Sequence, residues 1–335
     1  MPNSQRSILA AVTLFFVAPL VAEYLLGDFA ITFLWPLVTL APMYGGGALL
    51  IRELTRRSGR GWPTILLLGV AYAIIEEAFT TQTLFNPNIF GKHWHLLSHA
   101  WIPALGIGAW WTLFMLNVHP FWSIGVSIAL VEGLFPRAPQ TPWLGKVGLT
   151  VAAVLFAFGI YAGTAYTLHH DPFRASHTQF VVSALLVVIF AAAAFLVPAS
   201  ARLTEPTATR EPLPAPSPWI TAAVTFLLGA AVFLAPIFWD WGAVALILGV
   251  DLAFLVGLWL VSHRSAWTPL HTLSIGAAGA LVYGVHAFMG NPVVPTPKSV
   301  AVLSHIVCLV LALAVIALGV FRTRAAAPPQ ELPCA

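Results

Sequence analysis

The sequence is poor in charged side chains. Its 335 residues include 15 lysines and arginines and 12 aspartates and glutamates, so that charged residues make up only 8% of the chain. A soluble globular protein needs roughly 25% charged residues to solvate its surface. This shortage excludes a soluble enzyme, a disordered protein and a nucleic-acid-binding protein, and we expect no nucleic-acid partner. The small basic excess is typical of the cytoplasmic loops of membrane proteins.

Cysteine is also scarce. Cys308 lies in an apolar run and Cys334 lies in the C-terminal tail, so that a disulfide framework is not expected. Residues 1–26 have no convincing small-residue cleavage site after their apolar stretch, which favours a retained first helix over a signal peptide.

Apolar residues are abundant. They make up 59% of the chain, and the mean hydropathy is +0.88. A bilayer core of ~30 Å needs about 20 apolar residues in a helix. Segments of this kind lie at 8–26, 30–51, 62–84, 103–135, 147–168, 179–197, 219–239, 241–261, 268–289 and 299–321. The sequence therefore predicts an all-α, polytopic transmembrane helical bundle of about ten spans, with the lipid bilayer as its surroundings.

The fourth segment, residues 103–135, is long for one span and short for two. If it crosses once and the N-terminus is cytoplasmic, the predicted loops place 12 of the 15 basic residues on the cytoplasmic side. If it crosses twice, the basic residues divide 7 to 8 and carry no orientation signal. The positive-inside rule therefore predicts one crossing, tilted or kinked near Pro120, and cytoplasmic termini.

A proline-rich segment divides the chain. Residues 198–218 contain six prolines without periodicity, which predicts an extended cytoplasmic linker. It separates a six-span unit, residues 1–197, from a four-span unit, residues 219–321. Residues 322–335 are expected to form a cytoplasmic tail. The two units show no sequence repeat, so that an inverted-repeat transporter is not indicated.

Two short stretches around the second span favour structural roles. The run Met43–Ala48 is rich in glycine, which is typical of close helix packing. The next stretch carries Arg52, Arg56, Arg57 and Arg60. We expect these arginines to form a basic cytoplasmic loop that sets the orientation and contacts anionic lipid headgroups.

Several ionisable residues fall inside predicted spans. A charge near the bilayer centre costs ~2.5–3.5 kcal/mol on insertion scales, so such residues need a reason. They are Glu23, Glu76, Glu77, His119, Glu132, Asp251, His286 and His305.

The adjacent pair Glu76 and Glu77 is the most informative. Neighbouring helical positions point about 100° apart, so we expect that the two carboxylates do not face one partner equally. Glu76 shares a polar stripe with Tyr72 and Thr83, whereas Glu77 falls on a mostly apolar face. A desolvated carboxylate of this kind is suited to general acid or base work.

Histidines supply candidate metal ligands. His119 lies in the long fourth span, where Ser123 follows it one turn later on a second polar stripe. The preceding loop carries three more histidines, of which we single out His95. Imidazole is the commonest metal ligand, so His95, His119 and Glu77 are candidate ligands of a divalent metal such as zinc.

Two motifs resemble those of a known family. Glu76-Glu77-Ala78-Phe79 looks like the Glu-Glu motif of the CAAX-protease and bacteriocin-processing (CPBP) intramembrane proteases, and the segment starting at His119 looks like their His-x-x-x-Asn motif. The resemblance covers residues 69–128. It implies that a glutamate activates water, that His119 completes the site, and that Ser123 replaces the oxyanion-stabilising Asn. The family's Arg after the glutamates and its Phe-x-x-x-His motif are missing.

Three functions stay open at this stage. The first is a CPBP-like, metal-dependent intramembrane hydrolase with Glu76, Glu77, His119 and Ser123 as its site. The second is a proton-coupled transporter that uses Glu23, Glu132, Asp251, His286 and His305. The third is a non-catalytic membrane subunit or scaffold. The expected location is the cell membrane of a prokaryote, and the sequence names no substrate or protein partner.

Overall fold

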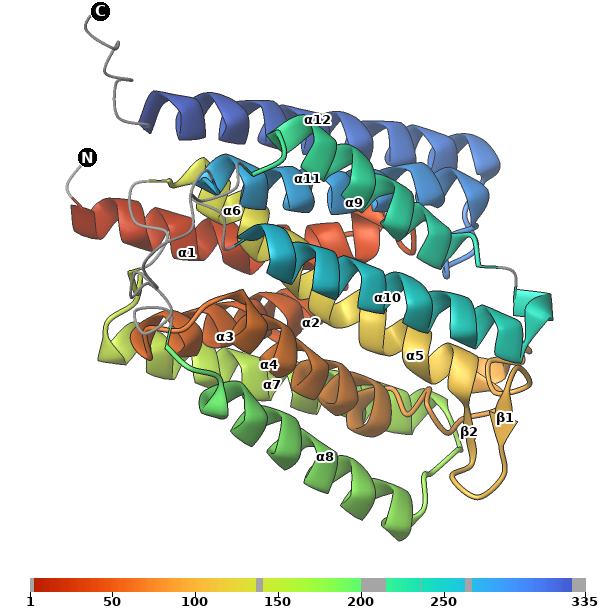
Figure 1. The fold of residues 1–335 in the computed structure, drawn as a ribbon. Coiled ribbons are helices and arrows are strands. Elements are labelled where there is room, and N and C mark those ends of the chain that lie inside the picture. The colour runs from red at the N-terminus through yellow and green to blue at the C-terminus, as the bar shows by residue number, and fades with distance from the viewer. Residues whose placement is uncertain (1–2, 137–140, 200–214, 236, 263–266, 327–335) are drawn as a thin grey trace, which may run out of the picture.

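The computed structural model describes residues 3–136, 141–199, 215–235, 237–262 and 267–326, which form a bundle of long helices (Figure 1). Within these ranges, eight helices are long and apolar enough to cross a membrane. The expected all-α membrane bundle is therefore confirmed. The predicted second span corresponds to a helical run over residues 37–57, and the predicted seventh to the shorter apolar helix α9. The count of ten spans stays a prediction.

The elements follow one another in a simple order. Residues 3–136 form α1 (Asn3–Pro19), η1 (Leu20–Leu25), α2 (Leu37–Leu40), η2 (Ala41–Gly45), α3 (Gly46–Arg57), α4 (Trp62–Ile74), η3 (Ile75–Thr80), η4 (Ile89–Gly91), β1 (Trp101–Ile102), β2 (Ile107–Gly108), α5 (Ala109–Asn117), η5 (Val118–Val126) and α6 (Ser127–Leu134). The later ranges form α7 (Lys146–His170), α8 (His177–Leu196), α9 (Pro218–Phe233), η7 (Ile237–Trp239), α10 (Trp241–Ser262), α11 (Pro269–His286), η8 (Ala287–Met289) and α12 (Lys298–Ala326).

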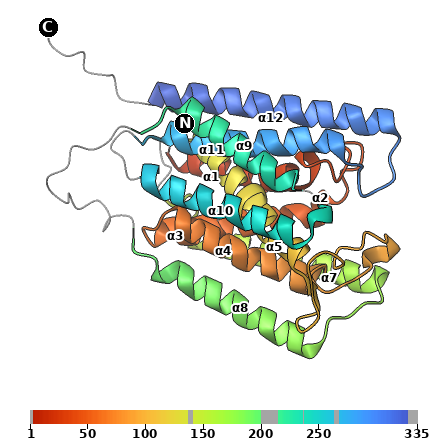
Figure 2. The same ribbon diagram turned by 45° about the vertical axis from the view of Figure 1, so that its right-hand side comes forward.

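The helices are arranged in layers. Figures 1 and 2 show α12 and α11 along one side of the bundle, α7 and α8 along the opposite side, and α1, α5 and α6 between them. Helices α11 and α12 pack against α6 and η1, so that the predicted four-span unit is built onto the predicted six-span unit. Most of the predicted linker and of the predicted tail lies outside the described residues. Helix α1 begins and α12 ends at the same end of the bundle, and the membrane side of that end stays a prediction.

Four helices contain π-helical segments, in which each backbone N–H bonds five residues back and the turn is wider. These are η1, η2, η3 and η5. Proline removes a backbone donor and disturbs regular α-helix. Pro19 precedes η1, Pro42 lies in η2 and Pro120 lies in η5. The irregularity expected near Pro120 is thus a π-helical stretch within one continuous helical run.

The predicted start of the fourth span, at residue 103, is wrong. The long helix begins at Ala109, and the preceding residues form the antiparallel pair β1–β2. Gly106 adopts φ +65° between the two strands, a left-handed conformation that glycine tolerates best. We call this side of the bundle the hairpin end.

The expected basic loop after the second span is wrong for Arg52 and Arg56, whereas Arg57 is exposed at the end of α3 and Arg60 lies in the loop that follows. Arg52 and Arg56 lie within α3, and their exposed fractions are 0% and 4%. Both donate to the carboxylate of Glu132, with Arg52 Nε–Oε1 at 3.0 Å and Arg56 Nη2–Oε2 at 2.8 Å. Arg52 Nη1 also donates to Glu53 over 2.7 Å, and the ring of Trp143 covers its guanidinium. A buried carboxylate partner on another helix keeps these arginines inside the protein. We call this side of the bundle the arginine end.

The glycine-rich run of the second span packs closely, as predicted. A Cβ atom on Gly45 would lie 2.0 Å from the carbonyl oxygen of Phe15 on α1. From the other side, a Cβ atom on Gly159 of α7 would lie 2.4 Å from the backbone nitrogen of Met43. Both glycines are therefore required by direct backbone approach.

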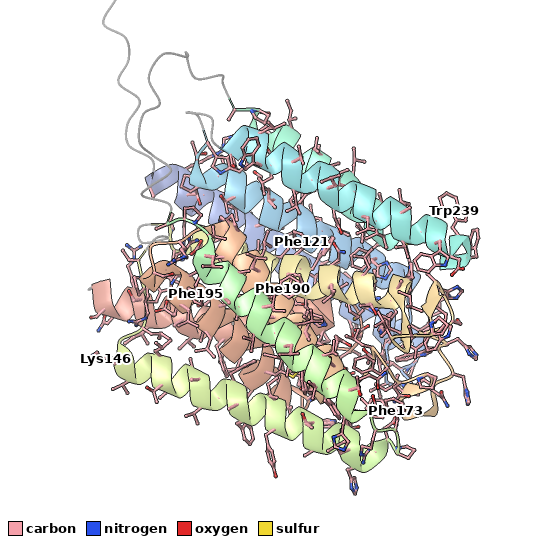
Figure 3. The ribbon with its side chains drawn as sticks, turned by 60° about the horizontal axis from the view of Figure 1, so that its bottom comes forward. Phe121, Lys146, Phe173, Phe190, Phe195 and Trp239 are labelled. Carbon is pink, nitrogen blue, oxygen red and sulfur yellow. The ribbon has the colours of Figure 1, made fainter. Side chains whose placement is uncertain are left out.

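Helices α7 and α8 diverge from their junction near Phe173, and their far ends are marked by Lys146 and Phe195 (Figure 3).

A buried aspartate fastens the loop that follows η3. Asp171, just beyond α7, accepts hydrogen bonds from the side chain of Asn86 at 3.0 Å and from the backbone N–H groups of Phe90 at 2.6 Å and Phe173 at 2.8 Å. Burial opposes ionisation of this carboxyl, but the two backbone donors and Asn86 outweigh it and hold its pKa below the usual range.

We expect Glu132→Gln to lower the free energy of unfolding by about 3–5 kcal/mol, because it leaves two buried arginines without their shared anion. Thermal unfolding of the detergent-solubilised protein would measure the change. Asp251→Asn is the matched control, since Asp251 has an amide rather than an arginine as its partner. Equal unfolding midpoints for the two variants would contradict this account of the network.

We expect the contribution of Asp171 to depend on pH. Its pKa is lowered by folding, so its stabilisation is complete above the unfolded pKa of about 3.9 and is lost as pH falls through the folded pKa. Asp171→Asn should therefore cost about 1–3 kcal/mol at pH 7 and progressively less below about pH 4. A difference between wild type and variant that stays constant from pH 7 to pH 3 would contradict this.

Candidate functional site

The structure brings Glu76, Glu77 and His119 together in the interior of the bundle. The distance from His119 Nε2 to Glu77 Oε1 is 2.8 Å, and that from His119 Nδ1 to Glu76 Oε2 is 3.3 Å. The exposed fractions are 3% for Glu76, 5% for Glu77 and 3% for His119. One nitrogen of the imidazole thus faces each carboxylate.

The expectation that the two glutamates could not face one partner equally is wrong. It assumed regular α-helix, but both residues lie in the π-helical segment η3, where the angle between successive side chains is smaller. His119 lies in another π-helical segment, η5, on the helix packed against α4. The predicted polar stripe is also broken, because the helix ends at Thr80, and Thr83 in the following loop bonds to Glu77 rather than to Glu76.

Each glutamate has its own supporting donors. The hydroxyl of Tyr44, from η2, donates to Glu76 Oε1 over 2.5 Å. The hydroxyls of Thr81 and Thr83 both donate to Glu77 Oε2, the former over 3.2 Å. The carboxylates are therefore oriented by side chains from within the same bundle, and His119 lies between them.

Two aromatic rings enclose the imidazole. The Tyr44 ring lies 6.1 Å from the His119 ring, and the Tyr72 ring lies 5.9 Å from it. Among the described residues, three buried polar atoms at this centre make no regular hydrogen bond, namely Tyr72 Oη, Glu76 Oε2 and His119 Nδ1, although the last two lie 3.3 Å apart. Buried polar atoms are normally satisfied, so unsatisfied ones at a functional site point to a further ligand or water.

The predicted oxyanion donor lies nearby. Ser123 is 1% exposed and follows His119 by one turn in η5. The hydroxyl of Tyr283 of α11 donates to the carbonyl oxygen of Val118, the residue before His119, over 3.4 Å. Ser123 therefore belongs to the same buried region.

The transport candidates are divided among different environments. Glu132 belongs to the ion-pair network at the arginine end. Asp251 of α10 accepts a hydrogen bond from Asn117 Nδ2 over 3.0 Å. His286 packs against Phe233, with ring centroids 4.7 Å apart. These contacts do not describe a relay.

Glu23 and His305 lie closer to the central cluster, the name we use for Glu76, Glu77 and His119. Glu23 is an electrostatic neighbour of Glu76 and His119. His305 packs beside Gly27 in the turn after η1, at 3.2 Å from the position of a Cβ atom on that glycine. The first helix thus extends the cluster toward the hairpin end.

The metal-ligand candidates are now separated. Among the described residues, Glu76, Glu77 and His119 form the one group of three whose ligand atoms lie close enough to hold an ion, all within 4.8 Å of one another. His95 is exposed in the loop before the hairpin and is not in that group.

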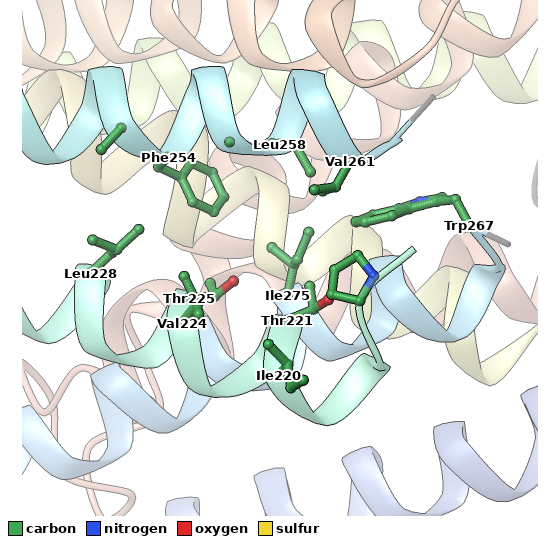
Figure 4. Close-up of a pocket in the computed structure, with 13 residues that line it drawn as sticks. Ile220, Thr221, Val224, Thr225, Leu228, Phe254, Leu258, Val261, Trp267 and Ile275 are labelled. Atoms are coloured by element: carbon green, nitrogen blue, oxygen red, sulfur yellow. The ribbon is translucent and has the colours of Figure 1, made fainter. Parts of the chain in front are cut away.

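A cavity of about 180 Å³ lies between α9, α10 and α11 (Figure 4). Its walls include Leu228, Phe254, Val261 and Trp267, and no titratable side chain lines it. It offers no group for acid, base or metal chemistry.

Sequence reasoning missed Tyr44 and Glu53. Tyr44 lay in the glycine-rich run that indicated packing, and a phenol within such a run was the available signal. Glu53 lay beside Arg52 at the edge of a predicted span, where a carboxylate is unremarkable.

The comparisons with known proteins identify a family without an assigned activity. Residues 12–237 match the model of an uncharacterized membrane protein family, and this range includes every residue of the central cluster. They do not confirm the resemblance to the CPBP proteases. No curated protein and no solved structure matches the chain. Because the matched range spans more than half of its length, the chain belongs to this uncharacterized membrane protein family.

Proposed function

We propose that the protein is a metal-dependent hydrolase embedded in the cell membrane of a prokaryote, with Glu76, Glu77 and His119 as its centre. One observation carries the proposal: two carboxylates and an imidazole offer ligand atoms within 4.8 Å of one another, each on a residue at least 95% buried. Ionisable side chains at this depth are costly and mark functional sites by default.

The residues fit a divalent cation. Two carboxylates and one imidazole are a donor set suited to zinc and similar ions. Two carboxyl groups face one imidazole, so the cluster would be negative overall with both carboxyls ionised, even with a charged imidazole. A cation would offset that charge and would satisfy Glu76 Oε2 or His119 Nδ1.

When bound, such an ion acts as a Lewis acid and makes water acidic enough to give a nucleophile near neutral pH. Side chains of the protein accept the proton of the water and stabilise the developing negative charge. Glu77, held by Thr81 and Thr83, accepts the proton of the attacking water. Ser123 donates to the oxygen that becomes negative as the carbonyl is attacked.

Zinc titration of the purified full chain tests the site. Glu76→Gln, Glu77→Gln and His119→Ala should each weaken binding by more than the roughly 10–100-fold that loss of an outer-shell partner costs. His95→Ala is the matched control and should bind as wild type does, because His95 is not in the cluster. Zinc affinity that depends on His95 but not on His119 would overturn the proposal.

Peptide cleavage tests the chemistry. Metal-loaded protein should cleave members of a mixed peptide library, read by mass spectrometry. Glu77→Gln should slow cleavage by about 10²–10⁴-fold as a lost general base. Ser123→Ala should slow it by up to about 10²–10³-fold as a lost oxyanion donor. Unchanged cleavage in Glu76→Gln, Glu77→Gln and His119→Ala would remove the hydrolase.

A further inference from the structure

Residues 81–108, which we call the strap, cross the hairpin end of the bundle between η3 and α5. The strap contains η4 and the β1–β2 pair, and Figure 1 shows that pair beyond the end of α5. The first residues of the strap touch the central cluster, because Thr81 and Thr83 donate to Glu77 Oε2. The backbone N–H of Leu84 also donates to the carbonyl oxygen of Glu77, over 3.3 Å. The strap is therefore continuous with the candidate site.

Two aspartates from other parts of the bundle hold the strap in place. The carboxylate of Asp171, at the junction of α7 and α8, accepts a hydrogen bond from the backbone N–H of Phe90 over 2.6 Å. The carboxylate of Asp240, between η7 and α10, accepts one from the backbone N–H of Ala100. Each aspartate thus binds the main chain of the strap from a turn between two helices.

A lysine and several apolar side chains add to this attachment. Lys92 Nζ donates over 3.1 Å to the carbonyl oxygen of Val293, which lies between η8 and α12. Ile89, Leu96 and Leu97 of the strap are buried. The strap is therefore held by three different turns of the bundle and by its own apolar side chains, and it spans the whole hairpin end.

The backbone of the strap is strained. Among the described residues, six that are not glycine have φ between +49° and +60°, a left-handed conformation that costs free energy for any residue with a side chain. Five of the six lie in the strap, and the sixth is the aspartate that holds Ala100. They are Gln82, Phe90, His93, His95, Ala100 and Asp240. Residues held in this way cluster at ligand clamps and switch regions.

The strain and the attachments oppose each other. When the strap lifts from the bundle, its five left-handed residues can return to ordinary backbone conformations, which favours opening. The hydrogen bonds of Asp171, Asp240 and Lys92 are lost at the same time, which favours closure. A segment with such a balance opens locally at a smaller free-energy cost than the core of the protein does.

The central cluster needs an opening of this kind. Glu76, Glu77 and His119 are all buried, so a peptide bond reaches them only when a covering segment moves. The strap begins at the donors of Glu77 and ends at α5, the helix that continues into η5 and His119. Movement of the strap would therefore uncover the site between the two helices that build it.

We infer that the strap is a lid over the central cluster, which opens at the hairpin end to admit a peptide and closes to exclude bulk water. The inference rests on the proposed function for what enters the site, and not for how the strap moves. Asp171, Asp240 and Lys92 hold the closed state and touch no substrate.

Modification of His119 by diethyl pyrocarbonate tests the inference on the full chain in detergent micelles without added metal. The reagent carbethoxylates neutral imidazole, and mass spectrometry of the peptide that contains His119 gives its rate apart from those of the exposed histidines. Asp240→Gly removes the carboxylate that holds Ala100 and keeps a residue that tolerates φ +55°, so this rate should rise about tenfold or more. Lys92→Met should raise it by a smaller factor.

A variant with the opposite effect guards against general loosening of the protein. His95 is exposed and adopts φ +52°, so His95→Gly relieves strain in the closed strap and should slow modification of His119 by about twofold or more. Asp251→Asn is the matched control and should react as wild type does, because Asp251 bonds to Asn117 outside the strap. Hydrogen exchange within α4 should be the same in every variant, which reports an intact bundle.

The outcomes separate the lid from the proposed function. Equal His119 rates in wild type, Asp240→Gly and Lys92→Met would overturn the lid, as would faster hydrogen exchange in the strap of Asp240→Gly with an unchanged His119 rate. An accelerated His119 rate in a protein that neither binds zinc nor cleaves peptides would keep the lid and remove the hydrolase. Cleavage that depends on Glu77, together with a His119 rate that ignores both strap variants, would keep the hydrolase and remove the lid.

Discussion

Burial of charge without water is the constraint on which this structure depends. Inside a membrane-spanning bundle, every ionisable side chain must find its partners within the protein. At the arginine end the constraint is met by Glu132, which lies between Arg52 and Arg56 and joins α3 to α6. In the interior it is met by His119, which lies between two carboxylates and joins the fourth span to the third. The first arrangement pairs two arginines with the carboxylates of Glu53 and Glu132, whereas the second places one imidazole between two carboxyl groups.

The wide π-helical turns explain how the interior site is assembled. Glu23, Tyr44, the glutamate pair and His119 each come from a different π-helical segment, although these segments are far apart in the sequence. Wide turns of this kind are frequent at functional sites, where the less regular backbone re-aims side chains. Here they direct both glutamates to one imidazole and bring the Tyr44 hydroxyl to Glu76. The close contacts of Gly45 and Gly159 hold η2 between α1 and α7, so the packing of small residues supports the geometry of the site.

In the proposed chemistry, the carboxylates have different roles. In the proposed hydrolase, Glu76 and Glu77, almost fully buried, provide ligands and a base. Helices α7, α8 and α10 carry many exposed apolar side chains, and Asp251 on α10 is held by Asn117.

The sequence by itself determined the class of the protein, because scarce charge and long apolar runs leave no alternative to a helical membrane bundle. It also named Glu76, Glu77, His119 and Ser123, because ionisable and polar residues within apolar runs stand out against their surroundings. It could not determine how these residues meet. Periodicity arguments assume regular α-helix, so they separated the two glutamates that the π-helical turn brings together, and they read Tyr44 as a packing residue. Only the tertiary structure decided that Arg52 and Arg56 are internal and that the Tyr44 hydroxyl reaches Glu76, because these partnerships join helices whose packing no local pattern encodes.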